Sequence, residues 1–145
     1  MLTPTVPAFA GRLHPTRLKL QPLKETTMSL LANLLVALIA VLHVYILVLE
    51  MFLWDKPAGL RAFGQTLEAA TASKVLAANQ GLYNGFLAAG LFWGLLLGAE
   101  GTGVKVFFLT CVLIAGLYGA ATANRKILFI QAIPAAIGLL LVMLA

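Results

Sequence analysis

The chain has 145 residues, enough for one domain. Apolar residues make up 61% of it and charged residues 10%, whereas a soluble domain is roughly 45–50% apolar and about 25% charged. These proportions exclude a disordered protein, a disulfide scaffold and an ordinary soluble enzyme, and they predict an integral membrane protein.

The net charge of +5 comes from ten Lys and Arg residues against five Asp and Glu residues. The basic residues are scattered between apolar blocks, as in the flanks of membrane segments, so we expect no nucleic-acid partner. One cysteine, Cys111, and two histidines are too few for an intramolecular disulfide or for a multi-cysteine or histidine-rich metal site. Because nucleotide-binding loops and zinc motifs are also missing from the sequence, we expect no metal and no cofactor.

Residues 1–27 differ from the rest of the chain. They contain four prolines and four basic residues and have no periodic apolar face. We expect a disordered tail, which is either cytoplasmic or the product of an upstream start codon, because Met28 is followed by Ser-Leu-Leu-Ala and would be a natural start.

Four long apolar segments follow, and each is long enough to cross a bilayer as a helix. They comprise residues 30–54, 75–99, 104–123 and 127–144. At about 1.5 Å per residue, such lengths bracket the ~20 residues that a hydrocarbon core of about 30 Å requires. Turn signals separate the segments, and the last two connections are short. The sequence therefore predicts an all-α fold: a multipass bundle of four transmembrane helices with antiparallel neighbours over residues 28–145, in contact with the lipid bilayer.

Glycines and basic residues give two further expectations. Small residues recur every fourth position along 75–99, so this helix either packs closely within the bundle or forms a homodimer seam through Gly81, Gly85, Gly90 and Gly94.

Five basic residues lie in the connections 55–74 and 124–126, against Lys105 in the connection on the other side. Counted from Met28, this places both termini outside the cell, whereas the four basic residues of the tail make the two sides equal.

Polar side chains inside the apolar segments gather in one half of the bundle. Depth is measured from the side of the 55–74 connection. His43 and Asn84 lie ~13–17 Å deep, near the midplane, and a shallower group lies ~6–8 Å deep: Glu50, Asn79, Gln80, Tyr118 and Gln131. The opposite half offers only Asn33. Helical spacing puts His43 and Glu50 on one face. We therefore predict a polar pocket that opens toward one leaflet and ends near mid-membrane, with these ligand-binding residues: His43, Glu50, Asn79, Gln80, Tyr83, Asn84, Tyr118 and Gln131.

Each of these residues also has a structural interpretation. Glu50 is shallow enough to form an interfacial ion pair with Lys74 or Arg125. In the structural interpretation, His43 shares a hydrogen bond with Asn84 or donates one to a backbone carbonyl, and the amides join helices without binding a ligand. Pro134 is expected to kink the last helix.

Four stretches carry a resemblance to a known family. They are LVLEMFLW at 47–54, KVLAANQGLYNGFLAAGL at 74–91, AGLYGAAT at 115–122 and RKILFIQAIPA at 125–135. Together they resemble domain-of-unknown-function family 1304, small bacterial membrane proteins with about four spans. The resemblance covers residues 28–145 and implies a location in the bacterial inner membrane. It brings no established activity and hence no catalytic residue.

Three hypotheses of function remain open. The first is a membrane protein whose one-sided pocket binds a small amphipathic or lipid-like molecule. The second is a small proton-linked exporter, suggested by four helices and a membrane glutamate, although the other half of the bundle offers only Asn33 as a polar group. The third is an intramembrane isomerase with His43 and Glu50 as catalytic acid and base, about 10.5 Å apart along one helix. Whether the protein is an enzyme is left open.

Overall fold

The computed structural model describes residues 23–145, all of which form helices or short connections. The five α-helices are α1 (Leu23–Phe52), α2 (Pro57–Phe63), α3 (Leu67–Leu96), α4 (Thr102–Thr122) and α5 (Ile133–Leu144). A 3₁₀ turn, Gly98–Gly101, precedes α4, and a π-helical turn, Leu128–Ala132, precedes α5. The described part of the chain contains no strand, so the all-α prediction is confirmed.

The first helix begins earlier than expected. Residues 1–22 of the predicted tail lie outside the described residues, but α1 starts at Leu23 and so includes the last five residues that we assigned to the tail. Our boundary followed the apolar run alone. The residues before that run, from Leu23 to Met28, are compatible with a helix once the downstream turns are formed, because extending a helix costs far less than nucleating one.

The region between the first two apolar segments is helical as well. The unpredicted helix α2 begins with Pro57, whose missing N–H costs nothing in a first turn. It ends at Phe63 and is capped by Gly64, whose φ of +66° is a left-handed conformation that favours glycine. Two residues later Thr66 caps α3 by accepting a hydrogen bond from the Ala69 N–H at 3.2 Å. The second long helix therefore starts at Leu67, eight residues before the predicted boundary, and ends at Leu96 rather than at 99.

The predicted irregularity at Pro134 takes the form of a π-helical turn. Proline in a helix lacks the N–H that would bond to the carbonyl four residues earlier, and its ring crowds that carbonyl. The turn Leu128–Ala132 widens the helix immediately before Pro134, and the Ile133 N–H donates to the Leu128 carbonyl five residues back. Such bulges are a common way for a helix to accommodate a break in its hydrogen bonding.

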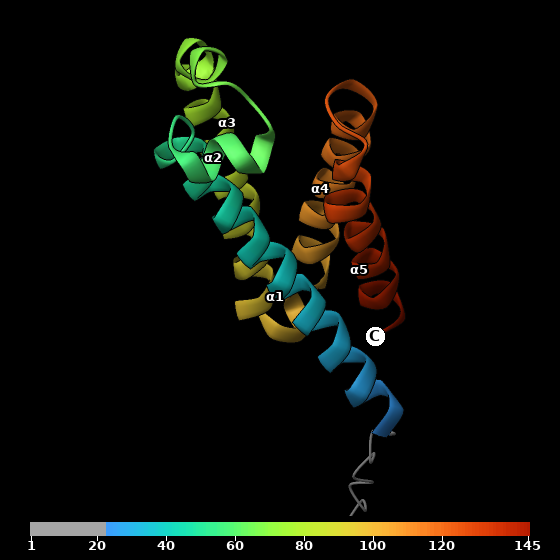
Figure 1. Ribbon diagram of the computed structural model, residues 1–145. Helices are drawn as coiled ribbons and strands as arrows, with labels where there is room; N and C mark the ends of the chain where they lie inside the picture. The colour runs from blue at the N-terminus through green and yellow to red at the C-terminus, as the bar shows by residue number, and fades with distance from the viewer. Residues whose placement is uncertain (1–22) are drawn as a thin grey trace, which may run out of the picture.

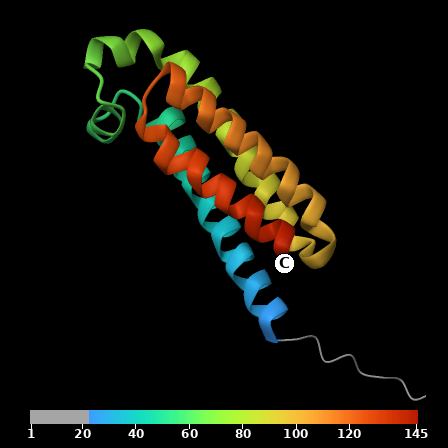
Figure 2. The ribbon, with the colours of Figure 1, turned by 90° about the vertical axis from the view of Figure 1, so that its right-hand side faces the viewer.

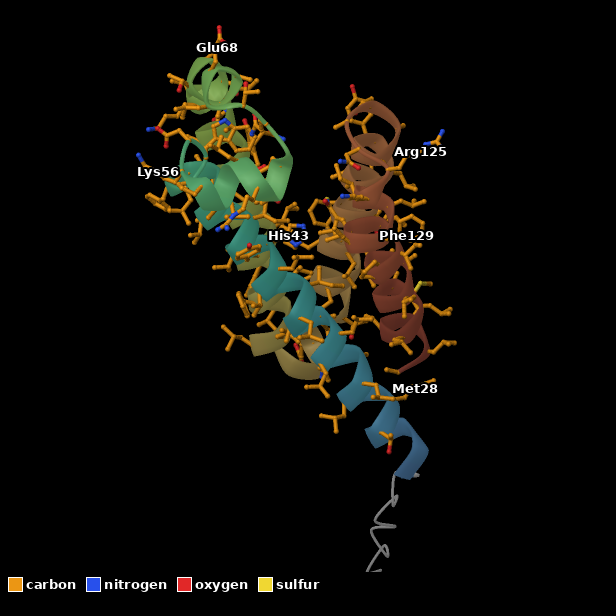
Figure 3. The ribbon with its side chains drawn as sticks, viewed as in Figure 1. Met28, His43, Lys56, Glu68, Arg125 and Phe129 are labelled. Atoms are coloured by element: carbon orange, nitrogen blue, oxygen red, sulfur yellow. The ribbon has the colours of Figure 1, made fainter. Side chains whose placement is uncertain are left out.

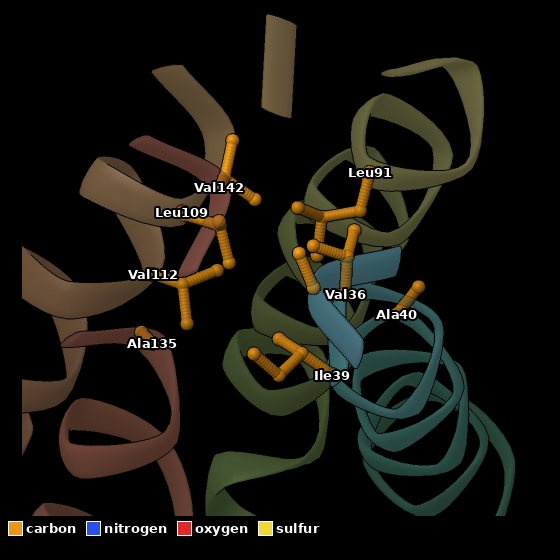
Figure 4. Close-up of a cluster of buried hydrophobic side chains, with 9 residues drawn as sticks. Val36, Ile39, Ala40, Leu91, Leu109, Val112, Ala135 and Val142 are labelled. Atoms are coloured by element: carbon orange, nitrogen blue, oxygen red, sulfur yellow. The ribbon is translucent and has the colours of Figure 1, made fainter. Parts of the chain in front are cut away.

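The long helices form two antiparallel pairs, α1 with α3 and α4 with α5 (Figures 1 and 2). The pairs contact one another through α3 with α4 and α1 with α5. Figure 1 shows them meeting near the C-terminus and diverging toward α2. Their shared core is made of small and branched side chains (Figure 4): Ala32, Val36, Ile39, Ala40, Leu91, Leu109, Val112, Ala135 and Val142.

The glycines of α3 serve the contacts within this bundle. A Cβ at Gly81 would lie 2.6 Å from Met51 Cγ, and one at Gly85 would lie 2.7 Å from Leu47 Cδ1, so both glycines face α1. Gly90 and Gly94 face α4, with Phe108 and Lys105 as their neighbours. The absence of side chains at these positions allows the close approach of the helices. A homodimer through the same four glycines stays a prediction.

The outer surface of the bundle is strongly apolar. Large apolar side chains are exposed along every long helix, among them Leu38, Val75, Leu96, Phe107 and Leu140. Two stretches, Thr27–Phe52 and Gly98–Thr122, are long and apolar enough to cross a membrane, and Leu128–Leu144 is a shorter apolar helix. The expectation of four comparable spans therefore needs correction: α3 carries Asn79, Gln80 and Asn84 within its apolar stretch, and these amides lower its hydropathy.

Candidate polar site within the helix bundle

His43 is fully buried on the core-facing side of α1. It continues the stripe formed by Val36, Ile39 and Ala40 and lies on the side of α1 that faces α4 and α5 (Figure 3). Its Nδ1 donates a hydrogen bond to the Ile39 carbonyl at 2.8 Å. The other ring nitrogen, Nε2, is buried and has no hydrogen-bond partner among the described residues. His43 therefore presents one unsatisfied polar atom to the middle of the bundle.

Glu50 and Asn84 form a direct pair between α1 and α3. The Asn84 Nδ2 donates to Glu50 Oε2 at 2.8 Å and also approaches the Gln80 carbonyl at 3.2 Å. Both side chains are half-buried. Gly81 makes the pair possible, because a Cβ there would lie 3.1 Å from the Cβ of Glu50 and push the helices apart. The structure thus joins two of the predicted site residues.

Gln131 belongs to the other helix pair. It lies in the π-helical turn, and its Nε2 donates to the Val112 carbonyl of α4 at 3.3 Å. This bond fastens the widened turn to α4, which gives Gln131 a structural role. The contact does not reach His43, Glu50 or Asn84.

The remaining predicted residues lie on the exposed surface. Asn79 lines a shallow, open groove with Met51 and Val75, on a different face of α3 from Asn84. Gln80 is exposed. Tyr83 is 55% exposed and packs edge-on against Phe86, with ring centroids 6.1 Å apart, and Tyr118 is 72% exposed on α4. The eight residues therefore do not form one cluster in the structure.

Two of the structural interpretations are also decided. Lys74 forms its ion pair with Asp55, at 2.9 Å, rather than with Glu50, so the predicted Glu50–Lys74 pair is wrong. Asp55 lies just after α1, outside the apolar stretch, and the hydrogen bond from Lys74 holds the pKa of its carboxyl below the ordinary value. For His43, the backbone carbonyl of Ile39 proves to be the partner rather than Asn84.

Sequence reasoning missed a second polar group, at the opposite end of the bundle. We counted Lys105 as a loop cation, but it lies in the first turns of α4 and is 6% exposed. Its Nζ donates to Asn33 Oδ1 of α1 at 3.1 Å and approaches the Gly98 carbonyl at 3.4 Å. The signal available in the sequence was that Asn33 and Lys105 both lie near the starts of their apolar segments, 30–54 and 104–123, and hence near the same end of the bundle.

The site offers hydrogen-bonding groups and one carboxyl. Within residues 23–145, as far as the structure describes them, no three His, Cys, Asp or Glu side chains lie close enough together to hold a metal ion. Cys111 is a free, half-buried thiol. The chemistry available at His43 and at the Glu50–Asn84 pair is therefore polar recognition or proton transfer.

Comparison with known proteins places this architecture in a family. The model of the family described as "Protein of unknown function (DUF1304)" matches residues 37–143, which include the second half of α1 and all later helices except the last residue of α5. The uncharacterized protein YpaA of Lactococcus lactis subsp. lactis (strain IL1403) is 31% identical over 106 residues, covering 72% of this chain and 89% of the relative. No solved structure matches the chain. The match spans His43, Glu50, Asn84 and Lys105, and the chain belongs to the DUF1304 family.

Proposed function

We propose that this chain is a multipass protein of the bacterial inner membrane that binds a small amphipathic or lipid-like molecule at His43 and the Glu50–Asn84 pair. In this proposal α1, α3, α4 and the stretch Leu128–Leu144 all cross the bilayer. The observation that supports a bound ligand is that Nε2 of His43 is buried and has no hydrogen-bond partner among the described residues.

The distribution of exposed residues supports the membrane location. Only 28% of the most apolar window of Thr27–Phe52 and 22% of that of Gly98–Thr122 are buried inside the bundle. The core helix of a soluble protein would be mostly buried. Exposing such helices to water would cost roughly 25 cal/mol for each Å² of apolar surface, whereas lipid tails solvate the same surface favourably.

The lengths of the helices fit the same proposal. Helices α1 and α3 have 30 residues each and α4 has 21, which correspond to about 45 Å and about 32 Å at 1.5 Å per residue. A hydrocarbon core is about 30 Å thick. The more polar beginning of α3, together with α2, lies beyond this thickness, at the end where Lys56, Arg61 and Lys74 are exposed.

The polar groups support a ligand rather than a purely structural role. A buried polar atom without a partner costs about 1–3 kcal/mol, and in lipid no water is at hand to reduce that cost. A hydroxyl or headgroup of a bound molecule would satisfy Nε2. Glu50 lies seven residues further along the same face of α1, so a molecule about 10 Å long would contact both groups.

Native mass spectrometry tests the proposal. The full chain is purified in micelles supplemented with a bacterial polar lipid extract, and the masses of retained molecules are recorded. We expect a specific adduct with the wild type that is lost in His43→Phe, which keeps a ring in the core but removes the nitrogens. Asn79→Ala, a polar deletion on another face of α3, is the matched control and should retain the adduct. Equal adducts in both variants, or none with the wild type, would refute the proposal.

A further inference from the structure

A separate cavity lies at the end of the bundle opposite α2, away from His43. Its volume is about 240 Å³, which exceeds the roughly 30 Å³ that one water occupies in the liquid. Residues of α1, α4, α5 and the turn before α4 line it, among them Ser29, Asn33, Gly98, Thr102, Lys105 and Val142. The walls therefore combine polar groups with the end of the apolar core.

Lys105 is the charged group of this cavity and is 94% buried, since its exposed fraction is 6%. Its ammonium has three N–H donors, and two acceptors are present, the Asn33 amide oxygen and the Gly98 carbonyl. Both acceptors are neutral. Among the described residues, no carboxylate lies within ion-pairing distance of Lys105, because the ion pairs found there all involve Asp55. One donor and the whole positive charge remain without a counterpart.

The packing of the lysine stem shows that this position is built into the fold. A Cβ at Gly94 would lie 2.7 Å from the Lys105 Cγ, so the stem crosses α3 where no side chain stands. Gly101 lies in contact with the Gly94 carbonyl at the same crossing. The two glycines allow α3 and α4 to enclose the stem, which directs the ammonium toward Asn33 on α1 rather than toward solvent.

The electrostatic setting favours an anion. Lys105 is the fourth residue of α4, and the N-terminal turn of a helix carries a partial positive charge that disfavours a cation there. A buried ammonium without a counter-charge is itself costly. A bound anion would offset both the repulsion from the helix N-terminus and the cost of burying the charge, by pairing with the ammonium in a charge-assisted hydrogen bond.

We propose that this cavity binds an anionic phosphate group, with Lys105 Nζ as its charged hydrogen-bond donor. The position at one end of the membrane-spanning helices suits two sources of the same chemistry, the headgroup of an anionic phospholipid and free inorganic phosphate. The proposal is independent of the ligand at His43, because the two sites lie in opposite halves of the bundle.

The experiment uses the full chain in phospholipid-free maltoside micelles and has one arm for each source. In the first arm, inorganic phosphate is titrated and the midpoint of thermal unfolding is followed, since a ligand that binds the folded state raises it. In the second arm, phosphatidylglycerol is added and its retention is measured by native mass spectrometry, with diacylglycerol, which lacks the phosphate, as the control lipid.

Three variants accompany both arms. Lys105→Met keeps the stem and removes the charge, Lys105→Arg keeps the charge, and Lys126→Met removes an exposed cation at the other end. We expect Lys105→Met to weaken binding about tenfold to a hundredfold, as loss of a hydrogen bond to a charged group does, and the other two variants to bind like the wild type. Lys105→Gln replaces the methionine variant if the latter does not fold.

The outcomes separate the sources. Retention of phosphatidylglycerol that depends on Lys105, without a phosphate effect, identifies a lipid headgroup, and a phosphate-dependent rise in the midpoint that depends on Lys105 identifies the free anion. Either result supports the site. A wild type that responds in neither arm, or binding that is equal in Lys105→Met and wild type, overturns it. Binding unchanged by His43→Phe shows that the result does not depend on the function proposed above.

Discussion

Gly116 of α4 faces Ala132 of the π-helical turn, and its replacement by alanine tests how the second helix pair is packed. A Cβ at Gly116 would lie 2.8 Å from the backbone nitrogen of Ala132 and 3.0 Å from its Cα and Cβ. Ordinary van der Waals contacts of a Cβ lie between 3.4 and 4 Å. Because the neighbour is backbone, no rotation of a side chain can relieve the overlap, and α4 must move away from the turn.

The matched control is Gly103, in the first turn of the same helix, where a Cβ would meet nothing within 4 Å. Alanine is favoured over glycine in a helix by roughly 0.5–1 kcal/mol, and this gain applies at both positions, although less fully in a first turn. Overpacking costs about 1–3 kcal/mol and applies at Gly116 alone. We therefore expect Gly116→Ala to be less stable than Gly103→Ala by about 1–3 kcal/mol.

The free energy of unfolding is measured for both variants in mixed micelles, by titration with SDS and far-UV circular dichroism. Gly116→Ala should unfold at a lower SDS fraction than wild type, and Gly103→Ala at an equal or higher one. If Gly116→Ala proves as stable as Gly103→Ala, the α4–α5 contact at the π-helical turn is wrong, and with it the structural role given to Gln131.

Three other predictions concern the first helix pair. Leu91 is fully buried between the pairs, so Leu91→Ala should lower the free energy of unfolding by about 2–5 kcal/mol in the same titration, and a loss below that range would contradict the shared core. A double-mutant cycle of Glu50→Ala and Asn84→Ala should give a coupling energy of about 0.6–2 kcal/mol, typical of hydrogen bonds between membrane helices; additive effects would show that the 2.8 Å contact contributes nothing. The lowered pKa of Asp55 means that its ion pair with Lys74 contributes stability above the ordinary carboxyl pKa of 3.8 and loses it as the pH falls through the lowered value. Lys74→Met should therefore be less stable than wild type at neutral pH and equally stable well below pH 3.8, and a difference that persists in acid would argue against this pair.

Composition and apolar runs were sufficient to predict the helical fold. The run at 104–123 became α4, Thr102–Thr122, with boundaries close to those expected, and the run at 30–54 became α1, which begins seven residues earlier at Leu23. Such runs predict helices because a helix satisfies its own backbone within one continuous segment. The predictions failed where helix formation depends on capping instead. Pro57 begins the short helix α2, and Thr66 caps a first part of α3 that precedes the apolar run, so hydropathy gave no indication of α2 or of the first two turns of α3.

The polar site was likewise predicted only in part. Spacing along one helix predicted that His43 and Glu50 share a face of α1. The hydrogen bond between Glu50 and Asn84 did not follow from depth, because Asn84 was expected nearer the midplane than Glu50. Depth alone did not predict which way Tyr83 and Tyr118 point, because that also depends on how each helix is rotated about its axis. Both residues lie at suitable depths but on the exposed surface. The sequence contains the periodicity of a helix but not its rotation relative to its neighbours.

The sequence was sufficient to predict that this protein is helical and strongly apolar, and to place its long helices approximately, since these properties arise from composition and from interactions within one segment. The tertiary structure decided which polar groups meet. Lys105 became a buried cation because Gly94 and Gly101 let α3 and α4 approach closely around its stem, and His43 retained a bare nitrogen because its neighbours across the bundle are apolar. Both results depend on contacts between helices, whose geometry follows from the packing of all side chains together.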